Sequence, residues 1–142
     1  MPKNLVAQAS TTVNVPAQMV WDALVNPDAI KRYMFGTNVT SSFKKGSKIT
    51  FKGEWKGKPY EDKGMILQSD ERKKLQYTHF SPMTGKPDVP ENYHTVTIEL
   101  SPAGKGTRVS LSQDNNETEE ERSHSQENWE MMLAELKKYV ES

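Results

Sequence analysis

The chain has 142 residues, with 19 Lys and Arg against 19 Asp and Glu, so its formal net charge is zero, and it contains no cysteine. This composition excludes disulfides, thiol catalysis and thiolate metal sites, and it argues against a nucleic-acid binder held by phosphate contacts. No apolar run approaches the roughly 20 residues that span a bilayer, and residues 1–6 lack the apolar core of a signal peptide, so we expect one cytoplasmic domain over residues 1–142 without a membrane span.

The N-terminal part of the chain predicts one strand followed by two short helices. Apolar and polar residues alternate over residues 5–15, which is typical of a strand with one buried face. Pro16 suits the first turn of a helix, because its missing N–H is not needed there. The apolar face of this helix is expected to contain Met19, Val20, Ala23 and Leu24, with Trp21 beside them. The Asn-Pro-Asp sequence at 26–28 then predicts a second short helix that ends at Gly36.

The middle of the chain predicts six further strands. Their expected ranges are 37–42, 49–55, 60–68, 75–79, 94–100 and 107–112. Residues 81–92 contain three prolines and one glycine, and we expect them to form a long loop. Strands that follow one another through short turns favour an antiparallel sheet, and a twisted sheet of this width tends to curl.

Residues 118–140 predict one long amphipathic helix. Thr118 followed by Glu121 fits a capping box, which satisfies free backbone N–H groups at a helix start. One apolar stripe at helical spacing contains Trp129, Met132, Leu133, Leu136 and Val140. A helix with one apolar face needs a sheet to cover, so we expect an α+β fold in which this helix fills the concave side of the sheet.

The inward faces of the predicted strands carry the most informative side chains. Phe51, Trp55, Tyr77, His79 and His94 all point toward the long helix if the alternation holds. An apolar lining with a few polar groups is typical of a small-molecule pocket. The plainer alternative is that the aromatic residues fill the core and that each histidine is simply hydrogen-bonded near a strand end.

The polar residues give no sign of a metal site or of nucleophilic catalysis. The three histidines include no pair with the i,i+4 spacing of a helix or the HxH spacing of a strand that metal ligands often show. The sequence also has no nucleophile elbow. We therefore expect no metal, no cofactor and no catalytic residue, and the sequence favours a non-catalytic domain.

Several short stretches share a pattern with one protein family. They are Val13-Asn14-Val15-Pro16, Val20-Trp21-Asp22-Ala23-Leu24, Asn26-Pro27, Leu75-Gln76-Tyr77-Thr78, Gly106-Thr107-Arg108-Val109 and Asn128-Trp129 followed by Leu133, Leu136 and Tyr139. Together they resemble the activator of heat-shock-protein-90 ATPase homologue family, which belongs to the START-like superfamily. The resemblance implies the helix-grip fold: a curved antiparallel sheet of about seven strands wrapped around a long C-terminal helix, with two short helices after the first strand.

The resemblance and the inward alternation together predict a binding domain. We expect a small, largely apolar ligand, lipid-, flavonoid- or polyketide-like, in a cavity between the long helix and the sheet, with a role in a stress response. The predicted ligand-binding residues are Tyr33, Phe51, Trp55, Tyr77, His79, His94, Trp129, Met132 and Leu136. His79 and His94 are expected to be polar anchors, and the loop at 81–92 and the second short helix to form the entrance.

Two alternatives stay open at this point. The first is a protein-interaction module of the co-chaperone kind, which needs no cavity and has a protein partner. The second is a cyclase- or hydrolase-type enzyme, in which His79 or His94 works with Tyr77 as an acid or base. A mostly apolar open cavity favours binding, converging polar groups deep inside favour an enzyme, and a filled core favours the interaction module.

Overall fold

The computed structural model describes residues 5–55 and 57–142. Its strands are β1 (Leu5–Val13), β2 (Asn38–Thr40), β3 (Lys48–Trp55), β4 (Lys58–Asp70), β5 (Lys74–His79), β6 (His94–Ala103) and β7 (Gly106–Asn116). Its α-helices are α1 (Ala17–Leu24), α2 (Pro27–Tyr33) and α3 (Glu119–Glu141), and two short 3₁₀ turns occupy Pro82–Thr84 and Pro90–Asn92.

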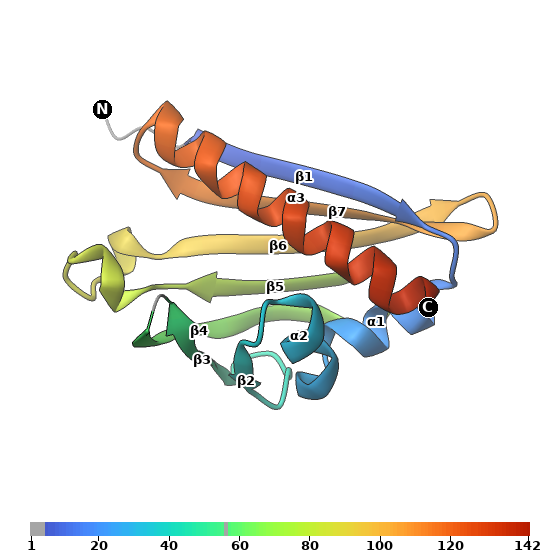
Figure 1. Cartoon of the computed structure of the whole chain (residues 1–142), viewed down its shortest axis with the longest axis horizontal. Coiled ribbons are helices and arrows are strands. Elements are labelled where there is room, and N and C mark those ends of the chain that lie inside the picture. The colour runs from blue at the N-terminus through green and yellow to red at the C-terminus, as the bar shows by residue number, and fades with distance from the viewer. Residues whose placement is uncertain (1–4, 56) are drawn as a thin grey trace.

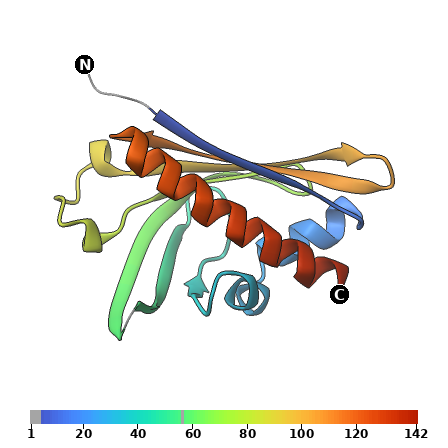
Figure 2. The same ribbon diagram turned by 45° about the horizontal axis from the view of Figure 1, so that its top comes forward.

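The strands form one seven-stranded sheet in the order β1-β7-β6-β5-β4-β3-β2 (Figure 1). Every neighbouring pair is antiparallel. Strands β2 to β7 follow chain order, with residues 80–93 as the long connection between β5 and β6, and β1 pairs with β7 at the other edge. Figure 2 shows that the sheet is curved, with β3 and β4 turned away from the plane of β1, β7 and β6. The predicted α+β helix-grip fold is confirmed.

Helix α3 lies across the sheet and packs mainly against β1, with α1 and α2 against its C-terminal half (Figure 1). Its buried side chains are Met132, Leu133, Leu136 and Val140. At its start, the Thr118 hydroxyl accepts a hydrogen bond from the Glu121 N–H at 3.1 Å, as the predicted capping box requires. In the described part of the chain, no helix is both long and apolar enough to cross a membrane.

The structure corrects the sequence prediction at two places. Met19 is 47% exposed, so it does not belong to the apolar face of α1, and the buried Trp21 takes that place. Strand β7 continues to Asn116, where the sequence predicted a link to the helix. The cause is the Asn116 side chain, which is fully buried and donates hydrogen bonds to the carbonyls of Leu5 and Gln113.

Gly64 sets how closely β4 and β5 approach each other. A Cβ at this position would lie 1.7 Å from the Thr78 carbonyl oxygen, so only glycine fits. The Met65 N–H also donates to the Thr78 hydroxyl at 3.0 Å. This close approach aligns the end of β5 with β4 and so positions two side chains of the candidate site, Asp62 and His79.

We expect the apolar stripe of α3 to be the main source of stability. Leu136→Ala should lower the free energy of unfolding by about 2–5 kcal/mol, the usual range for truncating a fully buried leucine. Met131→Ala is the matched control, because Met131 lies on the same helix but is 54% exposed, and it should change stability by less than about 0.5 kcal/mol. Urea melts measure both values, and similar losses in the two variants would contradict this packing of α3.

Candidate binding cleft

The interior beneath the C-terminal half of α3 is filled by side chains. A void of about 20 Å³ remains there, which is about the space that one water molecule needs. Tyr33, Phe51, Tyr77 and Met132 are among its lining residues, and Leu136 is fully buried in the surrounding core. The described side chains therefore leave no room for a ligand in this void.

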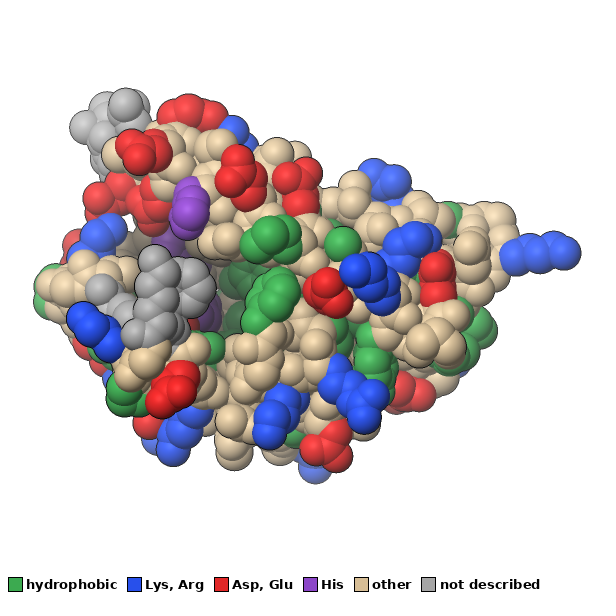
Figure 3. Space-filling view, viewed as in Figure 1, with side chains coloured by type: hydrophobic (Ala, Val, Ile, Leu, Met, Phe, Trp, Pro, Cys, Tyr) green, Lys and Arg blue, Asp and Glu red, His purple; other side chains and the backbone are tan. Residues whose placement is uncertain are grey.

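A cleft opens instead beside the N-terminal half of α3. Residues 119–128, which form this half, include no apolar side chain, so it has nothing to pack into the concave face of the sheet. One part of the cleft, called here the inner compartment because it borders the buried core residues Phe51 and Tyr77, has a volume of about 160 Å³. Its lining residues are Met34, Thr37, Phe51, Tyr60, Asp62, Tyr77, His79 and Trp129. Figure 3 shows the hollow, with apolar side chains and histidines at its walls.

Aromatic side chains form the walls of the inner compartment. The Phe51 ring lies 5.7 Å from the Tyr77 ring and 5.3 Å from the His79 ring, measured between centroids, and its contact with His79 is edge-to-face. These residues meet because β3 and β5 each turn alternate side chains toward the concave face. Trp129 forms the opposite wall on α3, and its indole N–H donates to the Gln113 side-chain oxygen at 2.5 Å.

His79 and Asp62 form a pair at the edge of this compartment. The His79 Nε2 lies 3.0 Å from the Asp62 Oδ2, and the Asp62 side chain is only 14% exposed. Because a carboxylate can only accept, the His79 Nε2 carries the proton, and Nδ1 is left as an acceptor when the ring is neutral. The other carboxylate oxygen, Oδ1, is buried and has no hydrogen-bond partner within the described residues. Such a pair can orient a polar group of a ligand or hold a proton.

The Tyr77 hydroxyl makes no hydrogen bond within the described residues, although most of the residue is buried. Tyr77 is 5% exposed, and no side chain or backbone group among residues 5–55 and 57–142 hydrogen-bonds its hydroxyl. Burial raises the pKa of Tyr77, so the phenol stays protonated and can both donate and accept. Tyr33, by comparison, is equally buried but donates to the Ala23 carbonyl at 3.0 Å.

The outer part of the cleft, called here the outer chamber, has a volume of about 350 Å³ and shares His79 with the inner compartment. Its remaining lining residues are Ser81, Thr84, Lys86, Asn92, His94, Gln113, Asn115, Glu117, Glu121, Ser125 and Asn128. His94 pairs with His79 across β5 and β6, and its Nδ1 donates to the Asp114 carbonyl at 2.8 Å. Its Nε2 is 4.0 Å from a Glu121 oxygen and borders the chamber.

The structure brings together most of the sequence-predicted binding residues. Phe51, Tyr77, His79 and Trp129 meet in the inner compartment, and His94 lies in the outer chamber. Tyr33 and Met132 border only the small void, and Leu136 lies in the closed core. The side chain of Trp55 lies outside the part of the chain that the structure describes. Their roles in binding stay predictions.

Asp62 and Gln113 are among the polar members of the cleft that sequence reasoning missed. Asp62 alternates with Gly64 and Ile66 along β4, so these three residues face the same side of the sheet. An acidic residue at such an inward position could have indicated the site. Gln113 follows Val109 and Leu111 on the inward face of β7, but it stands beyond the strand end that the sequence predicted.

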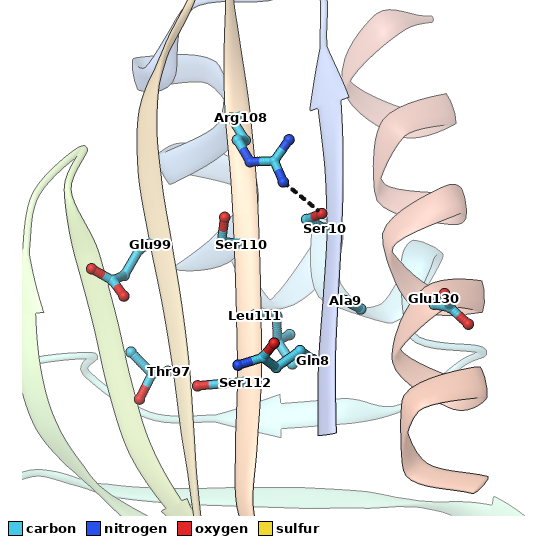
Figure 4. A pocket seen from close by; sticks show the side chains of 10 residues that line it. All are labelled: Gln8, Ala9, Ser10, Thr97, Glu99, Arg108, Ser110, Leu111, Ser112 and Glu130. Carbon is cyan, nitrogen blue, oxygen red and sulfur yellow. Dashed lines mark hydrogen bonds between the residues drawn. The ribbon is translucent and has the colours of Figure 1, made fainter. Parts of the chain in front are cut away.

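Another hollow lies elsewhere on the described surface. A depression of about 520 Å³ spreads over β1, β7 and β6, with Glu130 at its margin (Figure 4). Most of the side chains in it are polar, and Arg108 donates to the Ser10 hydroxyl at 3.0 Å. It has no aromatic lining, so it lacks the apolar walls that a small-molecule pocket usually has.

Metal binding has no geometric support in the described ranges. No group of three or more His, Cys, Asp or Glu side chains there is placed to hold a metal ion. His79 and His94 are cross-strand neighbours, but each ring already has a protein partner, Asp62 in one case and the Asp114 carbonyl in the other.

Comparison with known proteins identifies the relatives of this chain. Residues 14–141 match the family described as Activator of Hsp90 ATPase homolog 1-like protein. The solution structure of a structural-genomics target from Cytophaga hutchinsonii is 63% identical, with a TM-score of 0.84, and the match covers 96% of this chain and 94% of that chain. A search of curated proteins found no match.

More distant structures share the fold alone. The Aha1 dimer from Colwellia psychrerythraea is 17% identical, with a TM-score of 0.75 and 96% of each chain covered. Ara h 8.0201 is 14% identical, with a TM-score of 0.77, and the match covers 97% of this chain and 98% of that chain.

The unpartnered hydroxyl predicts an unusual effect of mutation. Tyr77→Phe should leave the free energy of unfolding unchanged or raise it, because the hydroxyl that it removes makes no hydrogen bond within the described residues. Tyr33→Phe is the matched control and should lower stability by about 0.5–1.5 kcal/mol, since it removes the bond to the Ala23 carbonyl. Thermal and urea melts measure both, and equal destabilisation would show that the Tyr77 hydroxyl has a partner.

Proposed function

The chain belongs to the family of Activator of Hsp90 ATPase homolog 1-like proteins, and we propose that it binds a small molecule with an aromatic or otherwise apolar body in the inner compartment of the cleft. The family supports a ligand-binding or co-chaperone-type domain. The inner compartment favours the first of these, because its walls are mostly aromatic and its polar groups are few.

The Tyr77 hydroxyl is the observation that carries this proposal. It makes no hydrogen bond within the described residues, and the buried Asp62 Oδ1 of the same compartment has no partner there either, so the compartment holds polar groups that a ligand can engage. Here the hydroxyl belongs to a residue that lines an open compartment rather than a sealed core. A ligand with a hydroxyl or carbonyl group would supply the missing partner.

The size of the inner compartment limits the ligand. Its volume of about 160 Å³ is close to that of the engineered ~150 Å³ cavity that binds benzene, so it accepts one aromatic ring. The ring would lie between Phe51 on the sheet and Trp129 on α3, with its polar substituent directed to Tyr77. His79, held by Asp62, would contact the edge of the ring.

A ligand screen tests this proposal. Phenols, flavonoids, sterols and fatty acids are titrated while tryptophan fluorescence and the melting temperature are recorded. A phenol should change the fluorescence of Trp129 and stabilise the fold by about 2.7 kcal/mol at ~100 times its Kd, because it binds the folded state alone. Tyr77→Phe should weaken phenol binding roughly two- to tenfold, the equivalent of one hydrogen bond.

The controls separate binding in the cleft from other effects. Trp129→Phe should keep the fold and reduce the fluorescence response, since Trp129 lines the compartment and Trp21 does not. Mass spectrometry should recover each bound compound unchanged. A converted product would instead favour an enzyme that uses the His79–Asp62 pair. No saturable binding by any class would overturn the proposal.

A second candidate function is co-chaperone activity, and Phe35 is the residue that favours it. Phe35 is 65% exposed and has a φ angle of 56°, a backbone region that bulky residues rarely adopt. Exposed aromatic residues are often the anchors of protein interfaces. Phe35 follows Met34, which lines the inner compartment, so a protein bound there would lie next to the cleft.

The co-chaperone alternative predicts an effect on an Hsp90 ATPase. If it is right, the chain should raise the ATPase rate, and Phe35→Asn should remove this effect, because asparagine tolerates the positive φ angle but offers no apolar contact. The same variant should leave phenol binding unchanged. An unaltered ATPase rate with the wild-type chain would rule this function out.

A further inference from the structure

The two parts of the cleft meet at His79, and this junction bears on the size of the ligand. The inner compartment, at about 160 Å³, is smaller than the roughly 300 Å³ at which small-molecule pockets usually begin. The outer chamber adds about 350 Å³ directly beside it. A molecule that places one ring in the inner compartment therefore has room for a larger second part in the outer chamber.

The charges in the outer chamber are already matched within the protein. Lys86 forms an ion pair with Glu117 at 2.8 Å. Glu121 accepts a hydrogen bond from the Glu117 N–H at 3.0 Å and lies in the first turn of α3, where the helix dipole favours a negative charge. An anionic head group would be repelled by the Glu117 and Glu121 carboxylates. A cationic head group would find Glu117 already paired with Lys86, and Glu121 already bonded to the Glu117 N–H. This balance favours an uncharged head group.

Gln113 supplies an amide NH₂ that makes no hydrogen bond within the described residues. It is 8% exposed, and its oxygen accepts the Trp129 indole N–H, which fixes the orientation of the amide. Within the described residues, no group accepts a hydrogen bond from its NH₂, although this residue lines the outer chamber. His94 Nε2 and the exposed Asn128 side chain border the same space, so donors and acceptors are mixed there.

We propose that the ligand is an amphiphile with a neutral, hydroxyl-rich head group, such as a sugar or another polyol. The ring lies in the inner compartment, the linkage passes His79, and the head group fills the outer chamber. Hydroxyl groups match this chamber because each one both donates and accepts, as the Gln113 amide, the Asn128 amide and the His94 ring together require. This inference rests on the function proposed above.

Four compounds that share one ring test the head group. Hydroquinone, 4-hydroxyphenyl β-D-glucoside, 4-hydroxyphenyl phosphate and 4-hydroxybenzylamine all keep a phenol for Tyr77 and differ only on the opposite side of the ring. Calorimetric titration of the wild-type chain should show the glucoside binding about tenfold or more tightly than hydroquinone, as two added hydrogen bonds would give. The phosphate and the amine should bind no more tightly than hydroquinone.

Variants locate the contacts. Gln113→Glu keeps an acceptor for Trp129 but removes the NH₂ group, and Asn128→Ala removes an exposed amide from α3. Each should reduce the preference for the glucoside about two- to tenfold while hydroquinone affinity stays unchanged. Ser110 lies in the depression over β1, β7 and β6, outside the cleft. Ser110→Ala is therefore the control and should change neither affinity. Tyr77→Phe should weaken hydroquinone and glucoside by the same factor.

The outcomes separate the two proposals. Equal affinity for hydroquinone and the glucoside would overturn the amphiphile inference and leave binding in the inner compartment intact. Tighter binding of the phosphate or the amine would overturn the neutral head group. A preference for the glucoside that survives both Gln113→Glu and Asn128→Ala would place the sugar elsewhere and also overturn it. Failure of all four compounds to bind would remove the proposed function itself.

Discussion

The packing of the apolar stripe of α3 onto the sheet is the interaction on which the rest of the structure depends. The stripe starts only at Trp129, because residues 119–128 are all polar. Burial of Leu133 and Leu136 therefore closes the C-terminal half of the interface and leaves the N-terminal half unable to exclude water from the concave face. The filled core and the open cleft are two consequences of one amphipathic pattern that covers half of a helix.

Helix α3 is also fixed to the free edge of the sheet. The Lys137 ammonium donates to the Thr12 carbonyl at 2.7 Å, and the Asn14 N–H donates to the Glu141 carboxylate at 2.8 Å. These bonds satisfy backbone groups of β1 and its continuation that would otherwise offer an edge for another strand. They also hold the C-terminal half of the helix in register with the sheet, so that Trp129 stands at a fixed distance across the cleft from Phe51 and Tyr77.

The sequence predicts the fold and about half of the cleft, for reasons that lie in particular residues. Alternation on β3 and β5 assigns Phe51, Tyr77 and His79 to the concave face, and helical spacing assigns Trp129 to the facing stripe. Periodicity gives a face but not a position along it, so Leu136 was expected in the cavity wall although it lies where the core is closed. The pairing of Asp62 with His79 depends on the register of β4 against β5, which Gly64 sets through a backbone contact that no local pattern encodes.

This division of α3 explains how the cleft can keep polar groups without partners. An unpaired buried polar group lowers stability by about 1–3 kcal/mol, which is a large share of the 5–15 kcal/mol that usually holds a domain together. Here the buried Asp62 Oδ1 is such a group, and the Tyr77 hydroxyl and the Gln113 NH₂ also make no hydrogen bond among the described residues. Leu133, Leu136 and their neighbours stabilise the fold at the C-terminal half of α3. Because the two sets of residues barely overlap, the groups available for a ligand can change without dismantling the core, and the core can be well packed without filling the cleft.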